Sequence, residues 1–388
     1  MKIAFIGQKG IPSISGGVEK HVEKLAVHLA EMGHNVTVYT RPAYTSKTFK
    51  EFQGVKLVSL PSIHTKHLDA ITHTFVATLH ALFQNYDVIH YHSIGPSILS
   101  FIPRIFRPDV RVIATFHSRD YFHQKWNFFA RFFLHFAEKV ICTVPEKTIV
   151  ISETLRDYAE AKYNRPFSLI PNGADVTSEP DTELLSQFGI RPKRYILSVS
   201  RLVAHKGIHY LIKAFNELED TNKLPNNFKL VIVGSPAHTE EYETFLKVLA
   251  KDRSNIVFTG EQTGKTLEEL FSHAYLFVQP SEDEGLSLAL LEAMGHRLMP
   301  IVSDIPANRE AIANTGITFA NKDVNHLKKE LAYFINRKDE VEALGKLAEA
   351  RVQEQYSWSA IARRTLEVYE EALGNYTTLK EPYARHTK

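Results

Sequence analysis

The chain repeats one succession of predicted elements near its start and again in its second half. Each time, an apolar strand, a polar or glycine-rich loop, a helix with apolar residues at helical spacing and a second strand follow one another. The first succession occupies residues 2–7, 8–17, 18–32 and 35–40, and the second occupies residues 195–199, 200–207, 208–219 and 229–233. Such alternation implies parallel, doubly wound sheets, which bind ligands at the carboxyl ends of their strands. We therefore expect an α/β chain whose two Rossmann-like domains face each other across a cleft.

The length of 388 residues also indicates two domains, because a single core of that size is uncommon. The pattern is interrupted between residues 171 and 193, where Pro, Asn, Gly and Asp gather, so the boundary is expected there. We assign residues 1–175 to the first domain and residues 176–356 to the second. Further strands are predicted at residues 55–60, 88–91, 110–116, 139–144, 149–152, 167–170 and 274–278.

The composition is that of a soluble protein. No run approaches the roughly 18 apolar residues of a membrane span, and the start of the chain lacks the features of a signal peptide, which predicts a cytoplasmic location. The only cysteine, Cys142, lies in the apolar run 140–144, which we interpret as a buried strand. One cysteine excludes disulfides within the chain and cysteine-based metal sites.

The net charge of +2 is unevenly divided along the chain. Residues 1–175 contain 20 Lys and Arg against 14 Asp and Glu, whereas the remainder contains 26 against 30. This division predicts a basic face on the first domain, and it does not indicate a protein that binds nucleic acid.

Paired glycines, Gly16 and Gly17, end the first loop directly before a helix. Glycines let backbone N–H groups approach an anion closely, and a helix start attracts negative charge. The loop contains neither a P-loop lysine motif nor the dinucleotide pattern G-x-G-x-x-G, which disfavours a P-loop NTPase and a dehydrogenase. A plain turn is the alternative interpretation.

The second loop carries two cations, Arg201 and Lys206, at the end of a buried strand. Surface cations are often only solvated. Here, however, the loop is expected at the same sheet edge as the other candidate loops, where charge-assisted contacts would bind a diphosphate. The same charges would stabilise a departing nucleoside diphosphate.

Glu284 and Glu292 flank the start of a predicted helix that follows a strand, a Pro-Ser turn and an acidic corner. A helix start suits a phosphate, and carboxylates on either side suit a polyol. From the residues alone, metal, acid–base and sugar roles stay open, and the acidic run 281–284 is a conceivable set of metal ligands. We favour the sugar contact.

The chain contains 19 histidines, many of them between residues 64 and 135. Their spacings match no zinc motif, so we expect no metal site. His117 differs because it follows the strand 110–116 at the sheet edge that faces the predicted cleft. A structural histidine is the alternative.

Together these features resemble the retaining nucleotide-sugar glycosyltransferases of the family-four group, which have the two-Rossmann-domain fold called GT-B. The resemblance covers almost the whole chain, and the opening residues look like the branch of polysaccharide rhamnosyl- and glucosyltransferases. The matching motifs are Gly16-Gly17-Val18-Glu19, Thr115-Phe116-His117, the run 170–175, the loop 200–207 and Glu284 with seven residues before Glu292.

The resemblance implies a role for each of these positions. Arg201 and Lys206 would bind the donor diphosphate, Glu292 the ribose and Glu284 the donor sugar, with His117 beside the reacting carbon. Backbone amides of the two glycine-containing loops would complete the phosphate site, at Gly16, Gly17, Gly285, Leu286, Ser287 and Leu288. Asn172 and Asp175 are weaker candidates, and residues 357–388 would return to the first domain.

The implied activity is hexosyl transfer with retained configuration, from a nucleoside-diphosphate sugar to a hydroxyl of a glycan or lipid-linked acceptor. Neither a metal nor another cofactor is expected, because cations and a helix start would stabilise the leaving group. Two alternatives remain: a nucleotide-sugar 2-epimerase with the same architecture, and a non-catalytic protein that binds nucleotide sugars.

Residues 101–136 combine cations with aromatic side chains, which suits the surface of an anionic bilayer. A core helix with a solvated basic face is an equally good interpretation. If the membrane interpretation holds, the protein works at the inner face of the membrane. The residues concerned are Arg104, Arg107, Arg111, Arg119, Lys125 and Arg131, against Asp109 and Asp120, interleaved with Trp126, Phe128, Phe129, Phe132 and Phe133.

Overall fold

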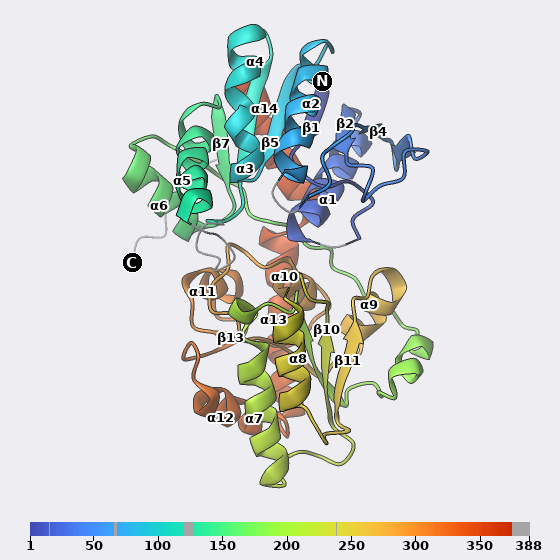
Figure 1. The fold of residues 1–388 in the computed structure, drawn as a ribbon. Coiled ribbons are helices and arrows are strands. Elements are labelled where there is room, and N and C mark those ends of the chain that lie inside the picture. Colours follow the sequence, from blue (N-terminus) through green and yellow to red (C-terminus); the bar gives the residue numbers. More distant parts are fainter. Residues whose placement is uncertain (15, 66–67, 120–127, 238, 375–388) are drawn as a thin grey trace.

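The computed structural model describes residues 1–374 except 15, 66–67, 120–127 and 238, and the side chains of residues 128–132 are also outside the description. Two α/β domains lie one above the other in Figure 1. Both sheets are parallel apart from one short edge strand, as the repeated pattern predicts. The doubly wound fold class expected from the sequence is confirmed.

The first sheet has the strand order β3-β4-β2-β1-β5-β6-β7-β8, with β3 antiparallel to β4. The central strands are buried on both faces, which is why they read as continuous apolar runs. The strands are β1 (Lys2–Ile6), β2 (Asn35–Thr40), β3 (Glu51–Phe52), β4 (Val55–Ser59), β5 (Val88–His92), β6 (Arg111–Phe116), β7 (Lys147–Val150) and β8 (Ser168–Leu169).

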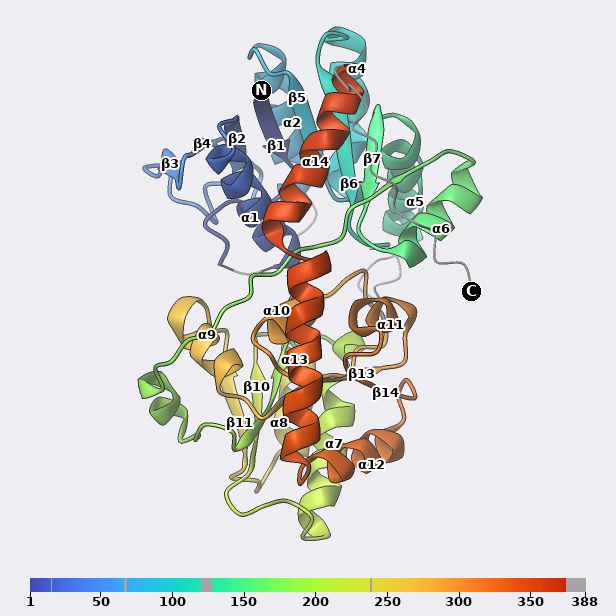
Figure 2. The ribbon, with the colours of Figure 1, turned by 180° about the vertical axis from the view of Figure 1, so that it is seen from behind.

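Helices cover both faces of this sheet. α2, α3, α4 and α5 lie on the face seen in Figure 1, and α1 and α14 lie on the opposite face, which Figure 2 shows. The helices of this domain are α1 (Gly17–Glu31), α2 (Asp69–Leu82), α3 (Ile94–Ser97), the 3₁₀ turn η1 (Ile98–Ser100), α4 (Phe101–Phe106), α5 (Phe128–Thr143), α6 (Glu153–Tyr163) and α14 (Trp358–Leu373).

The second sheet has the order β11-β10-β9-β12-β13-β14, all parallel. Apolar residues of α7, α8 and α12 join one core, and residues of α9, α10 and α11 join another. The strands are β9 (Tyr195–Val199), β10 (Lys229–Val233), β11 (Ile256–Gly260), β12 (Leu276–Gln279), β13 (Pro300–Ser303) and β14 (Ile317–Phe319). The helices are η3 (Glu183–Phe188), η4 (Ala204–Lys206), α7 (Ile208–Asp220), α8 (Glu240–Leu249), α9 (Gly264–Ser272), α10 (Leu288–Gly295), α11 (Pro306–Ile312), α12 (Val324–Phe334) and α13 (Lys338–Gln355).

The chain passes between the domains twice, and the two passages lie side by side. Ala174 N–H donates to the Tyr356 carbonyl at 2.8 Å, and a side chain at Gly173 would meet the Trp358 ring at 2.6 Å. After the second passage α14 packs against α1 and β6 of the first domain. Trp358 therefore anchors the return of the chain beside the first crossing.

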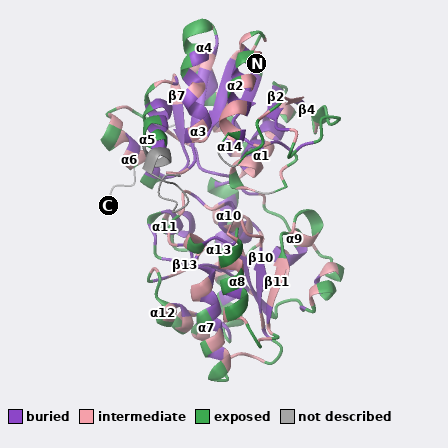
Figure 3. Cartoon of the chain, in the orientation of Figure 1, coloured by how far each residue is buried: buried purple, intermediate pink, exposed green. Residues whose placement is uncertain are grey.

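Burial follows the layers, since the strands of both sheets are mostly buried while the outer sides of the helices are exposed (Figure 3). Local signals set several helix starts. Ser152, Ser287 and Asp323 each accept a hydrogen bond from the backbone N–H three residues ahead, which satisfies one of the unpaired donors at a helix start.

The strand predicted at residues 139–144 is wrong. These residues form the last part of α5 and a turn, and Cys142 is buried in that helix, not in a strand. A short apolar run cannot distinguish a buried strand from a buried helix by periodicity, and here the helical alternative holds. The neighbouring strand, β7, begins only at Lys147. Most other predicted elements shift by one or two residues at their ends.

Candidate active site between the domains

The candidate residues gather where the carboxyl edges of the two sheets meet. The loop after β1 leads into α1 at Gly17, and the loop after β12 leads into α10 at Leu288. A side chain at Gly17 would lie 3.7 Å from the Leu288 side chain, and one at Gly285 would lie 2.4 Å from the His117 carbonyl. Gly285 therefore permits a close approach of the two backbones that a larger residue would prevent.

Lys206 and Glu284 form an ion pair on the wall of the second domain. Lys206 Nζ donates to Glu284 Oε1 at 2.5 Å, and both side chains are largely buried. Burial alone would raise the pKa of Glu284, but the charge and hydrogen bond of Lys206 outweigh it and hold that pKa below its usual value. Glu284 therefore stays ionised and is a weak base.

Arg201 belongs to the same loop as Lys206, and its side chain is exposed. Its guanidinium makes no hydrogen bond or ion pair within the described part of the chain. The loop that carries it turns at Gly207, where φ is +68° and a side chain would meet the Pro280 carbonyl at 2.0 Å. Gly207 thus sets the cationic loop directly against the loop that leads to Glu284.

Glu292 lies within α10, eight residues after Glu284 in sequence. Burial raises its pKa, and Lys20 and Lys24 of the first domain oppose that shift. Lys20 Nζ lies 3.8 Å from Glu292 Oε1, so this carboxylate faces a cation from the opposite domain. The helix starts at Ser287, whose hydroxyl accepts from Leu290 N–H at 3.3 Å. The remaining N–H groups of this first turn form a natural anion site.

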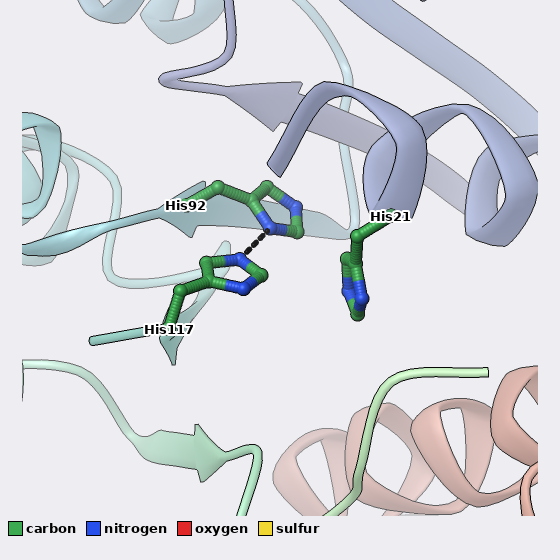
Figure 4. A group of neighbouring side chains, drawn as sticks. All are labelled: His21, His92 and His117. Carbon is green, nitrogen blue, oxygen red and sulfur yellow. Dashed lines mark hydrogen bonds between the residues drawn. The ribbon is translucent and has the colours of Figure 1, made fainter. Parts of the chain in front are cut away.

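Three histidines form the wall of the first domain, as Figure 4 shows. His92 and His117 stack and share a hydrogen bond between His92 Nδ1 and His117 Nε2 at 3.2 Å. His21 approaches His117 edge-on, with 4.8 Å between ring centroids. The three come from α1, β5 and the end of β6.

These histidines are neutral. Burial lowers the pKa of His21 to about 4 and holds the pKa of His92 and His117 well below the usual value, with neighbouring histidines adding to the effect. A neutral imidazole can both donate and accept a hydrogen bond. This wall therefore offers polar contacts without charge.

Asn172 connects the two walls. Its side-chain oxygen pairs with His21 Nδ1 at 2.9 Å, and its amide group donates to the Leu286 carbonyl at 2.8 Å. Asp175 accepts from Lys24 Nζ at 2.7 Å and so ties α1 to the crossing segment. Both weaker candidates thus stabilise the junction between the domains.

The group of His21, His92 and His117 could also hold a metal ion, since one ligand atom from each lies within 4.8 Å of the others. The acidic run 281–284 offers a less suitable set, because its carboxylates have diverging partners. Glu282 binds Lys322 at 2.8 Å and Tyr210 at 2.8 Å, whereas Glu284 binds Lys206.

One cavity between the domains is small. Ser118, Ser152, Asp283 and Glu284 are among the residues that line a volume of about 30 Å³. That is room for a water molecule, whereas ligand pockets usually measure about 300–1,000 Å³. This cavity is therefore too small for a nucleotide sugar.

Lys20, His21 and His92 were missed in the sequence analysis. Lys20 and His21 follow Gly17 within the first turns of a helix that starts at the cleft, so their spacing could have suggested them. His92 ends β5, the strand beside β6, and the argument applied to His117 also applies to it. His92 was missed because the sequence does not give the order of the strands in the sheet.

Two family models match the chain. Residues 15–178 match the model described as Glycosyltransferase Family 4, and residues 181–351 match the one described as Glycosyl transferases group 1. The chain is a two-domain glycosyltransferase. The predicted enzyme class, a hexosyltransferase, is confirmed together with the GT-B fold.

The similarities extend over whole chains. Phosphatidyl-myo-inositol mannosyltransferase of Mycolicibacterium smegmatis is 26% identical, over 93% of this chain and 92% of that protein. Sucrose-phosphate synthase from Thermosynechococcus elongatus superposes with a TM-score of 0.83 and 20% identity, over 97% of this chain and 100% of that one. Anabaena HepE in complex with UDP-glucose gives a TM-score of 0.79 and 18% identity, over 96% of this chain and 100% of that one. At these identities the solved structures establish the fold alone.

Proposed function

We propose that this glycosyltransferase moves a sugar from a nucleoside-diphosphate donor to a hydroxyl of a glycan or lipid-linked acceptor, with retained configuration and without a metal. The main support is one juxtaposition: the Lys206–Glu284 pair meets the neutral His117 wall across Gly285. The UDP-glucose named for HepE and the phosphatidylinositol named for the mannosyltransferase agree with such a donor and acceptor.

The cations serve the departing diphosphate. Arg201, Lys206 and the first turn of α10 would stabilise the negative charge that grows on the phosphate as the glycosidic bond breaks. Arg201 has no ion pair to break within the described chain, whereas Lys206 would share its donors between Glu284 and phosphate. Glu284 would accept hydrogen bonds from hydroxyls of the donor sugar.

The low basicity of the neighbouring groups favours transfer on one face of the sugar. Glu284 and His117 both have lowered pKa values and are weak bases at neutral pH. The departing phosphate is then the stronger proton acceptor close to the reacting carbon. It would take the proton of the acceptor hydroxyl, so the new bond forms on the face that the diphosphate leaves, and configuration is retained.

Metal independence is part of the proposal, and removing metal tests it. Treatment with EDTA should leave donor turnover unchanged, because Arg201 and Lys206 carry the charge stabilisation. Turnover that stops with EDTA and returns with Mg²⁺ or Zn²⁺ would contradict it and would direct attention to the histidine group.

The proposed site of action is the cytoplasmic face of a membrane. No helix in the described ranges combines the length and apolar character needed to cross a bilayer. Of the cations interpreted as a membrane contact, Arg104, Arg107 and Arg111 lie on or after α4. Lys125 and Trp126 lie outside the described residues, as do the side chains of Phe128, Phe129, Arg131 and Phe132.

A screen of nucleotide sugars tests the activity itself. One nucleotide sugar should release its nucleoside diphosphate slowly in water and faster with an acceptor, and NMR of the glycoside should show the donor's anomeric configuration. An inverted product would refute retention. Conversion of the donor to its 2-epimer without an acceptor would favour the epimerase, and binding without release would favour a non-catalytic protein.

A further inference from the structure

The helix face of the first domain that lies away from α1 and α14 exposes large apolar side chains. Phe75 and Leu79 lie four residues apart on one side of α2, and Phe83 follows the last residue of that helix; 47%, 38% and 85% of their surfaces are exposed. Large apolar side chains gathered on the surface of a soluble protein usually mark a binding surface.

The neighbouring helix α4 extends this surface. Phe101, Ile105 and Phe106 are exposed by 43%, 65% and 67%, and α4 packs against α2 on the same face of the sheet (Figure 1). Arg107 Nη1 donates to the carbonyls of Leu82 at 2.6 Å and Gln84 at 3.2 Å, which fixes the end of α4 beside the end of α2. We call these six residues, Phe75, Leu79, Phe83, Phe101, Ile105 and Phe106, the α2–α4 surface.

An apolar pocket adjoins this surface at Phe75. Its volume is about 570 Å³, and its lining includes Pro61, Ile63, Ile71, Phe75, Val76 and Leu99. The size and apolar lining suit a hydrocarbon chain. Pro61 lies just after the carboxyl end of β4, so the pocket opens near the sheet edge that carries the candidate active site.

The charges beside the surface favour an anionic partner. Three arginines beside the surface meet only two carboxylates. Arg104 pairs with Glu146, and Arg111 lies 4.0 Å from the same carboxylate. Arg107 binds Asp109 at 2.8 Å. One positive charge remains in excess. This excess suits anionic lipid head groups, while the apolar side chains provide most of the contact.

We propose that the α2–α4 surface lies on the head-group layer of an anionic bilayer and that the adjacent pocket takes one hydrocarbon chain of an anionic membrane lipid. The inference rests on the proposed function, because a lipid-linked acceptor presents its hydroxyl at that layer. With this helix face on the bilayer, the pocket at Pro61 lies towards the sheet edge that carries the candidate active site, and Phe83, Ile105 and Phe106 lie towards the opposite edge.

Co-sedimentation of the full chain with vesicles tests the docking. The protein should bind equimolar phosphatidylcholine and phosphatidylglycerol more tightly than phosphatidylcholine alone, and the variant F83D/I105D should bind at least about tenfold more weakly. The matched control is V248D/L347D, which changes residues of the second domain that are 63% and 52% exposed and should bind as the wild type. A wild type that stays in solution, or an F83D/I105D variant that binds normally, would overturn the proposal.

A pocket-filling variant tests the chain site. Leu99→Trp fills the pocket and adds apolar surface. If docking depends on surface contact alone, vesicle binding should be kept or strengthened; if a lipid chain occupies the pocket, vesicle binding should be weaker.

A fluorescent label on Ile63→Cys provides a second test, which does not require the pocket to be filled. The label should react at this position because the only native cysteine is buried. Phosphatidylglycerol with brominated chains should quench this label and not one on Val248→Cys. Absence of quenching, or unchanged binding of the Leu99 variant, would overturn the pocket assignment.

Two controls separate this inference from the proposed function. Release of nucleoside diphosphate in water, without vesicles, should be the same in F83D/I105D and the wild type. A wild type that releases nucleoside diphosphate but does not bind vesicles thus refutes only the docking, and a wild type that binds vesicles without release refutes only the glycosyl transfer. A wild-type dimer that F83D/I105D dissociates, without vesicle binding, would identify the surface as a contact between copies of the chain.

Discussion

The two walls of the candidate active site are built from opposite kinds of side chains. The wall from the second domain carries Arg201 and the Lys206–Glu284 pair, all charged, whereas the wall from the first domain carries His21, His92 and His117, all neutral because of burial. A diphosphate requires permanent positive charge, and a sugar requires hydrogen bonds that do not depend on pH. We therefore propose that the diphosphate binds Arg201 and Lys206 on the charged wall, and that the sugar lies between Glu284 and the neutral wall.

The largest expected effect follows from Lys206→Ala on the charged wall. Donor turnover should fall about 10²–10³-fold, because a preorganised cation at the departing phosphate is lost. The free energy of unfolding should also fall by about 3 kcal/mol, since Glu284 is left buried without its partner. Steady-state kinetics and thermal unfolding measure the two effects. The double variant K206A/E284Q should recover stability but not turnover, and normal turnover in Lys206→Ala would refute the assignment.

The variant Arg201→Ala should slow donor turnover without changing the stability of the fold. Because Arg201 is exposed and has no partner in the described chain, its removal should leave the melting temperature unchanged. Loss of a charge-assisted contact of about 1.5–3 kcal/mol predicts turnover about 10–100-fold slower. Arg191→Ala, an exposed arginine of the same domain, is the matched control. Equal effects of the two variants would exclude a specific role for Arg201.

The variants Glu292→Gln and Glu284→Gln distinguish the proposed roles of these two carboxylates. The Glu292 variant should raise the KM for the donor about tenfold at similar kcat, as expected for one lost ribose contact. The Glu284 variant should mainly lower kcat. If the two kinetic patterns are reversed, the ribose and sugar roles are exchanged.

The neutral wall should make the protein sensitive to acid. The pKa of His21 is about 4 in the folded chain and about 6.5 when unfolded, so below pH 6.5 the unfolded state binds the proton first. Stability is therefore complete above pH 6.5 and falls as the pH drops towards 4, with a share for His21 of up to about 3 kcal/mol. Denaturant unfolding of His21→Gln should show a shallower acid decline, and His64→Gln, an exposed control, should not. An unchanged decline in the His21 variant would contradict burial as the cause.

The sequence predicted the motifs of the charged wall better than those of the neutral wall. Arg201, Lys206 and Glu284 belong to loops that directly follow strands, so local pattern was enough to select them. His92 reaches the site through the strand order β1-β5-β6, which is a tertiary feature, whereas His21 could have been suggested by its place in the first turns of the helix after Gly17. Their side chains are also buried, a property that residue type did not reveal.

The prediction of the fold from the sequence is correct in outline and wrong in one place, for a clear reason. The repeated succession identified both sheets, and glycine or proline marked most loop positions. The run 139–144 contains Val, Ile and Cys, which suit a strand, yet it ends a helix whose apolar side packs beneath the sheet. The small cavity between the domains was also beyond the sequence, because it depends on contacts such as Gly285 against the His117 carbonyl.

Binding of the nucleoside diphosphate without its sugar tests the division between the walls most directly. Isothermal titration should use the nucleoside diphosphate that the donor screen identifies, with Arg201→Ala, His117→Ala and the wild type. The account predicts at least about tenfold weaker binding to Arg201→Ala and wild-type affinity for His117→Ala, although His117→Ala transfers sugar slowly. Equal weakening in both variants, or wild-type affinity in Arg201→Ala, would contradict the assignment of the diphosphate to the charged wall.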